Sequence, residues 1–135
     1  MADFDSLIAQ KARIRLVKGF YNENEYRTWA EVTQKFREFI PTLIRECEFG
    51  AIGTHDEALQ ALATDLIKKN NAEHRIEVQS FDGTKNQSLI ALAKQGFRTS
   101  VYVPFGDVRG FLRDGWHTFD LYRHFQRVLR LKTIR

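Results

Sequence analysis

Residues that could do chemistry recur at the ends of short β-like runs in this 135-residue chain. They are Lys18, Thr54, His55, Phe81, Asp82 and Tyr102. In barrels of βα units, functional groups gather at the carboxyl ends of the strands. The spacing of these residues therefore predicts a ligand site at one end of a parallel sheet.

Arg15 stands inside the first β-like run, where a charge is costly if the strand is buried on both faces. It therefore indicates an anionic or polar ligand. The alternative is that Arg15 and Lys18 pair with carboxylates of the protein while the other residues only cap helices. The pattern alone favours neither interpretation.

Four β-like runs alternate with helical patterns. The predicted strands are residues 13–17, 49–53, 75–79 and 99–103, and the predicted helices between them are 25–46, 56–69 and 85–95. We expect Pro41 to bend or divide the first helix, Thr54 and Glu57 to form a capping box, and Gly96 to end the third helix. This alternation predicts an α/β fold of βα units on a parallel sheet.

The positive charge of the chain, formally +4, sits largely near its end, where residues 117–135 form a basic amphipathic pattern. We expect a domain of residues 1–116 followed by a helix or tail of residues 117–135. Two interpretations of this pattern stay open: an ordinary solvated helix, and a helix that contacts a membrane surface or a partner. Nucleic-acid binding is disfavoured because the basic residues lack aromatic stacking platforms.

Other site chemistries find little support. Cys47 is the single cysteine, which excludes an intrachain disulfide and favours a reducing compartment. The four histidines lack metal-ligand spacing, so no metal site is expected. Neither a transmembrane run nor a signal peptide is visible, although a presequence removed before this numbering would leave the same sequence.

Several motifs together resemble proline dehydrogenases. They are Arg15-Leu-Val-Lys-Gly19 with Tyr21, Ala51-Ile-Gly-Thr-His-Asp56, Glu77-Val-Gln79, Gly96-Phe-Arg98 and Val101-Tyr-Val-Pro-Phe-Gly106. That family consists of FAD-dependent (βα)8 barrels that oxidise proline to pyrroline-5-carboxylate and pass electrons to membrane quinone. The resemblance implies four βα units like strands five to eight of a TIM-type barrel, plus a C-terminal amphipathic helix.

The resemblance also implies roles for individual residues. It implies that Arg15, Val17, Thr54 and His55 bind the cofactor. It also implies that Lys18 and Tyr102 are catalytic, and that Phe81 and Arg113 bind the substrate. A positive charge beside a flavin stabilises its reduced, anionic ring. Such a protein would be mitochondrial in a eukaryote, and otherwise cytoplasmic or peripheral to the inner membrane.

The chain departs from the family in two respects. The family clamps the substrate carboxylate with two successive arginines, whereas here Arg113 is followed by Asp114, which repels a carboxylate. Strands one to four are also missing, so we expect protein partners to cover the open half-barrel. Two hypotheses follow: a degenerate, non-catalytic structural or docking subunit, or the C-terminal part of an FAD-dependent enzyme completed by a separate N-terminal fragment. The lost arginine favours the first.

Overall fold

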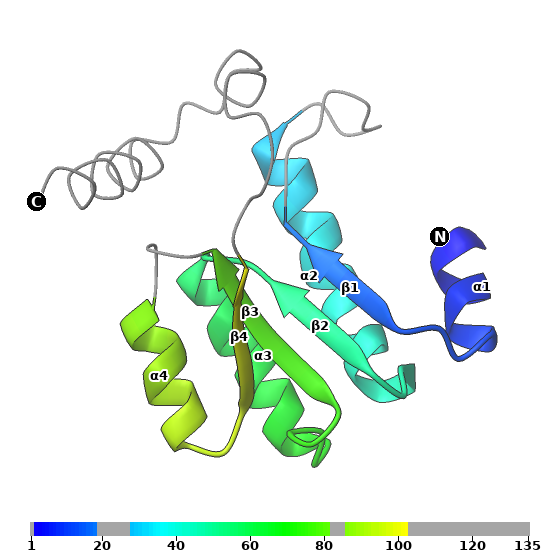
Figure 1. Ribbon diagram of the computed structural model, residues 1–135. Helices are drawn as coiled ribbons and strands as arrows, with labels where there is room; N and C mark the ends of the chain where they lie inside the picture. The colour runs from blue at the N-terminus through cyan, green and yellow to red at the C-terminus, as the bar shows by residue number, and fades with distance from the viewer. Residues whose placement is uncertain (1, 19–27, 82–85, 103–135) are drawn as a thin grey trace, which may run out of the picture.

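The computed structural model describes residues 2–18, 28–81 and 86–102, in which helices and strands alternate (Figure 1). The helices are α1 (Ala2–Ala9), α2 (Trp29–Glu46), α3 (Glu57–Lys69) and α4 (Asn86–Lys94). The strands are β1 (Ile14–Val17), β2 (Gly50–Gly53), β3 (Ile76–Phe81) and β4 (Arg98–Tyr102).

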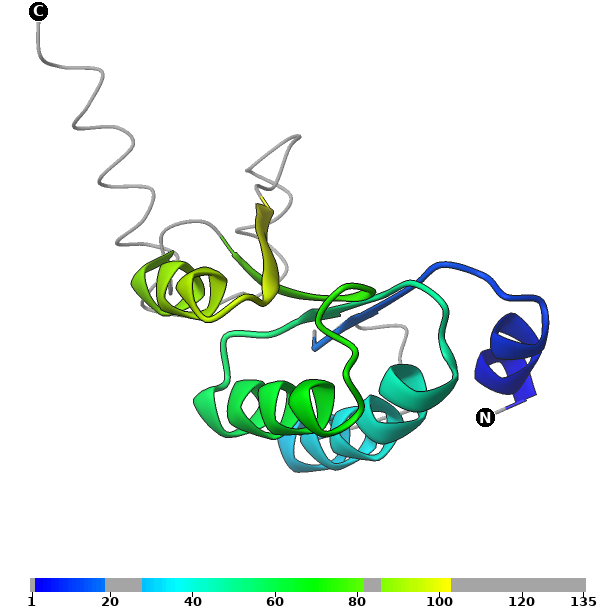
Figure 2. The ribbon, with the colours of Figure 1, turned by 90° about the horizontal axis from the view of Figure 1, so that it is seen from below.

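The four strands form one parallel sheet in the order β1-β2-β3-β4. Each strand therefore pairs with its neighbours in sequence, and each connection described between strands contains a helix. Figure 2 shows α2 and α3 beneath the same face of the sheet, with α4 beside β4. The predicted α/β fold with a parallel sheet is confirmed, and its shape is compatible with part of a barrel.

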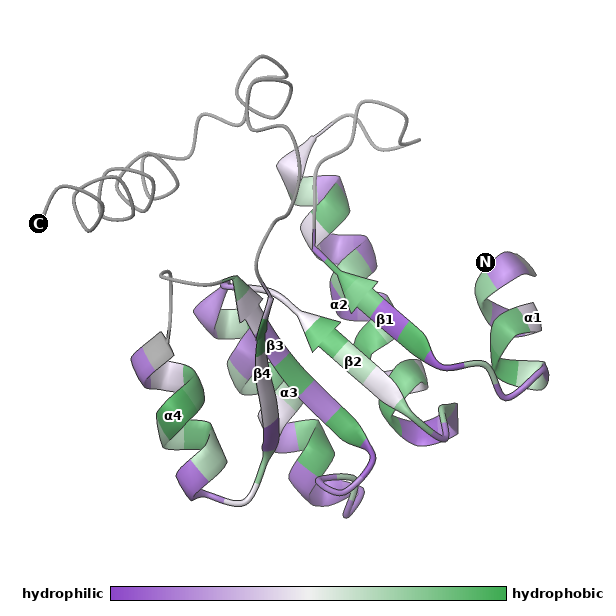
Figure 3. Ribbon diagram, in the orientation of Figure 1, coloured by the Kyte–Doolittle hydropathy of each residue, from purple (hydrophilic) through white to green (hydrophobic). Residues whose placement is uncertain are grey.

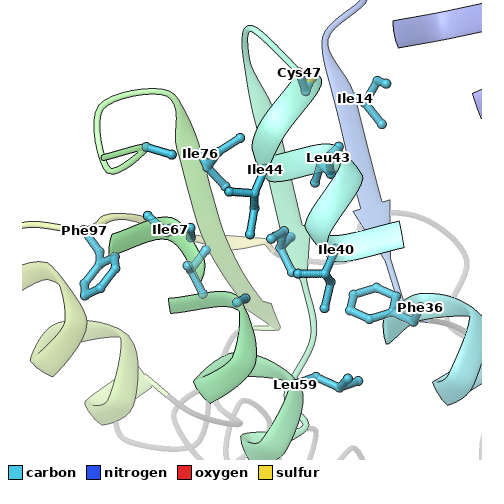
Figure 4. Close-up of a cluster of buried hydrophobic side chains, with 14 of the residues drawn as sticks. Ile14, Phe36, Ile40, Leu43, Ile44, Cys47, Leu59, Ile67, Ile76 and Phe97 are labelled. Atoms are coloured by element: carbon cyan, nitrogen blue, oxygen red, sulfur yellow. The ribbon is translucent and has the colours of Figure 1, made fainter. Parts of the chain in front are cut away.

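The hydrophobic core lies between the sheet and the helices (Figure 4). Its completely buried side chains include Ile40, Leu43, Ile44, Ile52, Leu59, Ile67, Ile76 and Val78. Most come from α2, α3 and the helix-facing positions of β2 and β3, because an amphipathic helix buries one stripe and a strand buries alternate residues.

The two faces of the sheet differ in chemistry. Along β3, Ile76, Val78 and Ser80 are buried while the residues between them are half-buried, and hydropathy alternates with burial from Ile76 to Gln79 (Figure 3). We call the side away from the helices the open face. The strand register places ten residues on it: Arg15, Val17, Ala51, Gly53, Glu77, Gln79, Phe81, Arg98, Ser100 and Tyr102.

We expected Pro41 to bend or divide α2, and it does not divide the helix. The helix is continuous from Trp29 to Glu46 with Pro41 inside it. Proline removes one hydrogen bond, but buried Phe36, Ile40 and Leu43 anchor the turns on both sides of it to the core.

The capping box expected from Thr54 and Glu57 is also wrong. Asp56 is the N-cap of α3, and its Oδ1 accepts hydrogen bonds from the backbone N–H groups of Ala58 (3.1 Å) and Leu59 (3.2 Å). Thr54 instead accepts a hydrogen bond from the Asp56 backbone N–H at 3.1 Å. Asp56 rather than Thr54 caps α3 because its carboxylate directly precedes the first helical turn.

Gly96 agrees with the sequence prediction, whereas the cap of α2 and helix α1 were not predicted. Gly96 follows α4 with a φ of +91°, as the prediction of a glycine stop required. A capping box between Thr28 and Glu31 starts α2, and the sequence analysis did not identify it. Helix α1 was also not predicted; its Phe4 ring lies 4.8 Å from that of Phe39 in α2. The helix expected at residues 117–135 lies outside the described residues.

Candidate ligand site on the open face of the sheet

Arg15 lies at the centre of a side-chain network on the open face. Its Nε donates a hydrogen bond to Gln79 Oε1 at 2.6 Å, across β2. Its guanidinium carbon lies 4.6 Å from the centroid of the Tyr102 ring, within range of a cation–π interaction. Residues from β1, β3 and β4 therefore hold one cation over the sheet.

Glu77 joins this network from β3. Its Oε1 accepts hydrogen bonds from Gln79 Nε2 at 2.7 Å and from Ser100 Oγ. Burial raises the pKa of Glu77, but the hydrogen bonds from Ser100 and Gln79 and the charges of Arg98 and Arg15 lower it, and the net pKa lies below its ordinary value. Glu77 is thus ionised at neutral pH, and it orients Gln79 so that the amide oxygen faces Arg15.

Gly53 is buried and lies beside the Arg15 guanidinium. A Cβ atom built there would lie 3.5 Å from Val17 Cγ2 and 3.8 Å from Arg15 Nη2, at ordinary contact distances. A side chain at this position would therefore fill the space in front of the cation. Without one, the Arg15 side chain lies close against the backbone of β2.

Two aromatic residues stand at the carboxyl ends of β3 and β4. Phe81 pairs with Tyr102 in register, and their rings meet edge to face with centroids 5.5 Å apart. Tyr102 thus contacts both Phe81 and Arg15. An apolar wall and a cation lie side by side, a combination suited to a ligand that is part hydrophobic and part anionic.

Lys18 and Asp56 form a second polar group at the ends of β1 and β2. Lys18 Nζ lies 2.7 Å from Asp56 Oδ2, and only 12% of the Lys18 side chain is exposed. The ammonium group also lies 6.0 Å from the centroid of the Trp29 ring. The sequence left open the alternative that Lys18 pairs with a carboxylate of the protein, and this ion pair is that arrangement.

Thr54 and His55 follow β2 but differ in environment. Thr54 is buried, its backbone N–H donates to Gln79 O at 3.2 Å, and its carbonyl accepts from Gln60 Nε2 at 2.7 Å. His55 is exposed. The Thr54 side chain therefore shapes the turn into α3, whereas that of His55 is accessible to solvent.

The structure brings Arg15, Val17, Phe81 and Tyr102 together on the open face. Lys18, Thr54 and His55 lie at the adjoining strand ends, while Arg113 lies outside the described residues. Within the part of the chain that the structure describes, no three metal-ligating side chains form a group. No helix among the same residues is long and apolar enough to cross a membrane.

The sequence analysis missed Glu77, Gln79 and Ser100 as site residues. A signal was present, because polar residues alternate with Ile76 and Val78 in a strand expected to be buried on both faces. Polar side chains at every second position of such a strand indicate a polar interior.

Comparisons with known proteins identify relatives. The chain is 30% identical over 109 residues to proline dehydrogenase 2 of Bacillus subtilis, covering 78% of this chain and 36% of that protein. Proline dehydrogenase 1 of the same organism is 31% identical over 104 residues (71% and 33%). The proline dehydrogenase of Deinococcus radiodurans is 29% identical over 114 residues (78% and 36%). No family model matches the chain.

These similarities confirm the resemblance to proline dehydrogenases. Most of the chain is a proline dehydrogenase-like region, and it spans about a third of the length of the curated relatives it matches.

Proposed function

We propose that the chain is half of a proline dehydrogenase-like barrel and acts as a structural or docking subunit whose open face is covered by another protein. The observation that carries this proposal is the sheet itself. Among the described strands, β1 and β4 pair on one side only. Exposed strand edges invite pairing, and parallel sheets are ordinarily covered on both faces.

The non-catalytic part of the proposal rests on the sequence after β4. Asp114 stands where proline dehydrogenases carry the second arginine of the carboxylate clamp. Losing a charged partner of a buried carboxylate typically costs about 2–5 kcal/mol, and Asp114 adds repulsion. Proline binding would therefore be weak even in a completed barrel.

A second candidate is the C-terminal part of an FAD-dependent enzyme completed by a separate N-terminal fragment. The open face favours it, because Arg15 lies there and a cation beside a flavin suits an anionic ring. Arg15 and Val17 would hold such a ring. FAD bound there would supply a hydride acceptor, and Arg15 would stabilise its reduced form.

One reconstitution experiment separates the two candidates. The full chain is titrated with FAD alone, and then mixed with the part of the Bacillus subtilis proline dehydrogenase 2 sequence that this chain does not match. We expect weak or no FAD binding by the chain alone, because half of the cradle is absent, and no proline-dependent reduction of a quinone analogue by the mixture. Asp114→Arg should restore little.

The matched variant is Arg113→Ala. If the mixture reduces the quinone analogue with proline and Arg113→Ala abolishes that activity, the non-catalytic proposal is wrong and the split enzyme stands. Submicromolar FAD binding by the chain alone would contradict the need for a covering half.

A further inference from the structure

The open face deepens into a pocket at the amino ends of the strands, away from the aromatic wall. Its volume is about 360 Å³. Its lining includes Arg13, Arg15, Arg75 and Arg98, with Glu77 as the one carboxylate. Four guanidinium groups against one carboxylate leave three positive charges in excess.

Among the described residues, the hydrogen bonds of Arg15, Arg98 and Arg75 go to uncharged acceptors, and the carboxyl end of α2 offsets part of the charge of Arg75. Arg15 donates to Gln79, Arg98 Nη1 donates to His74 O at 3.0 Å, and Arg75 Nη2 donates to Ile44 O at 2.6 Å. Arg13 lies 5.2 Å from the centroid of the Phe49 ring. The ion pairs recorded among the described residues join other side chains.

A second copy of the chain is a poor cover for this pocket. Two copies could close an eight-stranded barrel if β1 of each paired with β4 of the other. The interior would then hold Arg15 and Arg98 of both copies, four guanidinium groups against two copies of Glu77. Removing unpaired charges from water costs several kcal/mol per ion, so this closure is strongly disfavoured.

We infer that the cover is a segment of a different protein that carries carboxylate side chains opposite the pocket arginines. The inference rests on the proposed function, since it supposes that a protein covers the open face. It adds which side chains the covering protein presents to the pocket.

The strand edge next to the pocket suggests how the carboxylates are presented. A segment that extends the sheet along the outer edge of β1 places every second side chain on the open face. Arg13 and Arg15 are two residues apart and lie on this flank of the pocket. The covering segment therefore carries Asp or Glu at alternate positions of a strand.

Fluorescence anisotropy of a labelled peptide, Val-Glu-Thr-Glu-Val, titrated with the full chain at low salt tests the inference. We expect saturable binding that weakens about tenfold or more when glutamine replaces both glutamates, and also when the chain carries Arg13→Ser with Arg15→Ser. The matched control, Arg37→Ser with Arg45→Ser, removes two exposed arginines of α2 that do not line the pocket and should change the affinity less than twofold. Circular dichroism checks that both variants keep their helices.

Equal binding of the glutamine peptide, or of the Arg13/Arg15 variant, overturns the inference. Displacement of the peptide by inorganic phosphate at matched ionic strength also overturns it, because the pocket would then be a site for small anions. None of these readouts involves flavin or proline, so their failure is distinct from failure of the proposed function.

Discussion

Asp56 serves two purposes with its two carboxylate oxygens. Oδ1 caps α3, and Oδ2 accepts a hydrogen bond from Lys18 at the end of β1. The Lys18 hydrogen bond is the largest cause lowering the pKa of Asp56, and the backbone N–H groups at the helix start lower it further against the effect of burial. Because the folded-state pKa is depressed, this stabilisation is present above the unfolded pKa and is lost as pH falls through the folded value.

Substitutions at Asp56 separate the cap from the ion pair. Asp56→Ala should destabilise the fold by about 0.5–2 kcal/mol through the lost cap, with the lost ion pair in addition. Asp56→Asn keeps a good cap, so it should cost less and should flatten the acid dependence of stability below about pH 4. Urea midpoints measured across this pH range test both; an unchanged acid dependence in Asp56→Asn would assign that dependence to other groups.

At the scale of single residues, the sequence predicted which residues lie in the candidate site better than it predicted which residues they contact. Arg15 and Tyr102 were selected as site residues and do lie in contact. The bond from Arg15 to Gln79 could not be predicted, because it joins β1 to β3 and depends on the small residues of the strand between them. The choice between Asp56 and Thr54 as the cap depends on the residue at which the backbone changes from extended to helical, which spacing alone does not contain.

At the scale of elements, α2 contributes most to the core. Ile40, Leu43 and Ile44 are all completely buried against the sheet and α3. Its C-terminal end is also fixed by Arg75, whose guanidinium donates to the carbonyls of Ile44 and Cys47. These contacts explain why the helix tolerates Pro41 without breaking.

Truncating one buried and one exposed isoleucine measures this contribution. Ile44→Ala should cost about 2–5 kcal/mol in the free energy of unfolding, because it removes a fully buried side chain and leaves a cavity. Ile90→Ala, at a position on α4 that is 55% exposed, should change it by less than about 0.5 kcal/mol. Urea unfolding at one fixed protein concentration compares them, and equal costs would mean that α2 is not packed as described.

The elements themselves were largely predictable, since strands and helices alternate with clear periodicity. Each described strand lies within one or two residues of its predicted bounds. Helix α1 was missed because its eight residues are too few to show a strong period, and tertiary contact with α2 stabilises it.

In the part of the chain that the structure describes, helices cover one face of the sheet, and polar groups and a basic pocket lie on the other. We expect the isolated chain not to be a stable monomer, because its strand edges and open face need covering. Sedimentation velocity should show concentration-dependent association. A monodisperse monomer with a cooperative thermal transition would count against the proposed covering protein, whereas a discrete symmetric dimer would count against an acidic heterologous cover.

The order of the strands also bears on how the chain is made. Every strand pairs only with its neighbours in sequence, so β1 and β2 can pair once residue 53 and its flanking turn have left the ribosome. Synthesis proceeds from the N-terminus at about 5–20 residues per second, slowly enough for each unit to dock before the next arrives. The nascent sheet therefore grows from one side, and its newest strand presents unpaired hydrogen-bonding groups to its surroundings. Chaperones that shield extended segments would meet this chain at every stage of its synthesis.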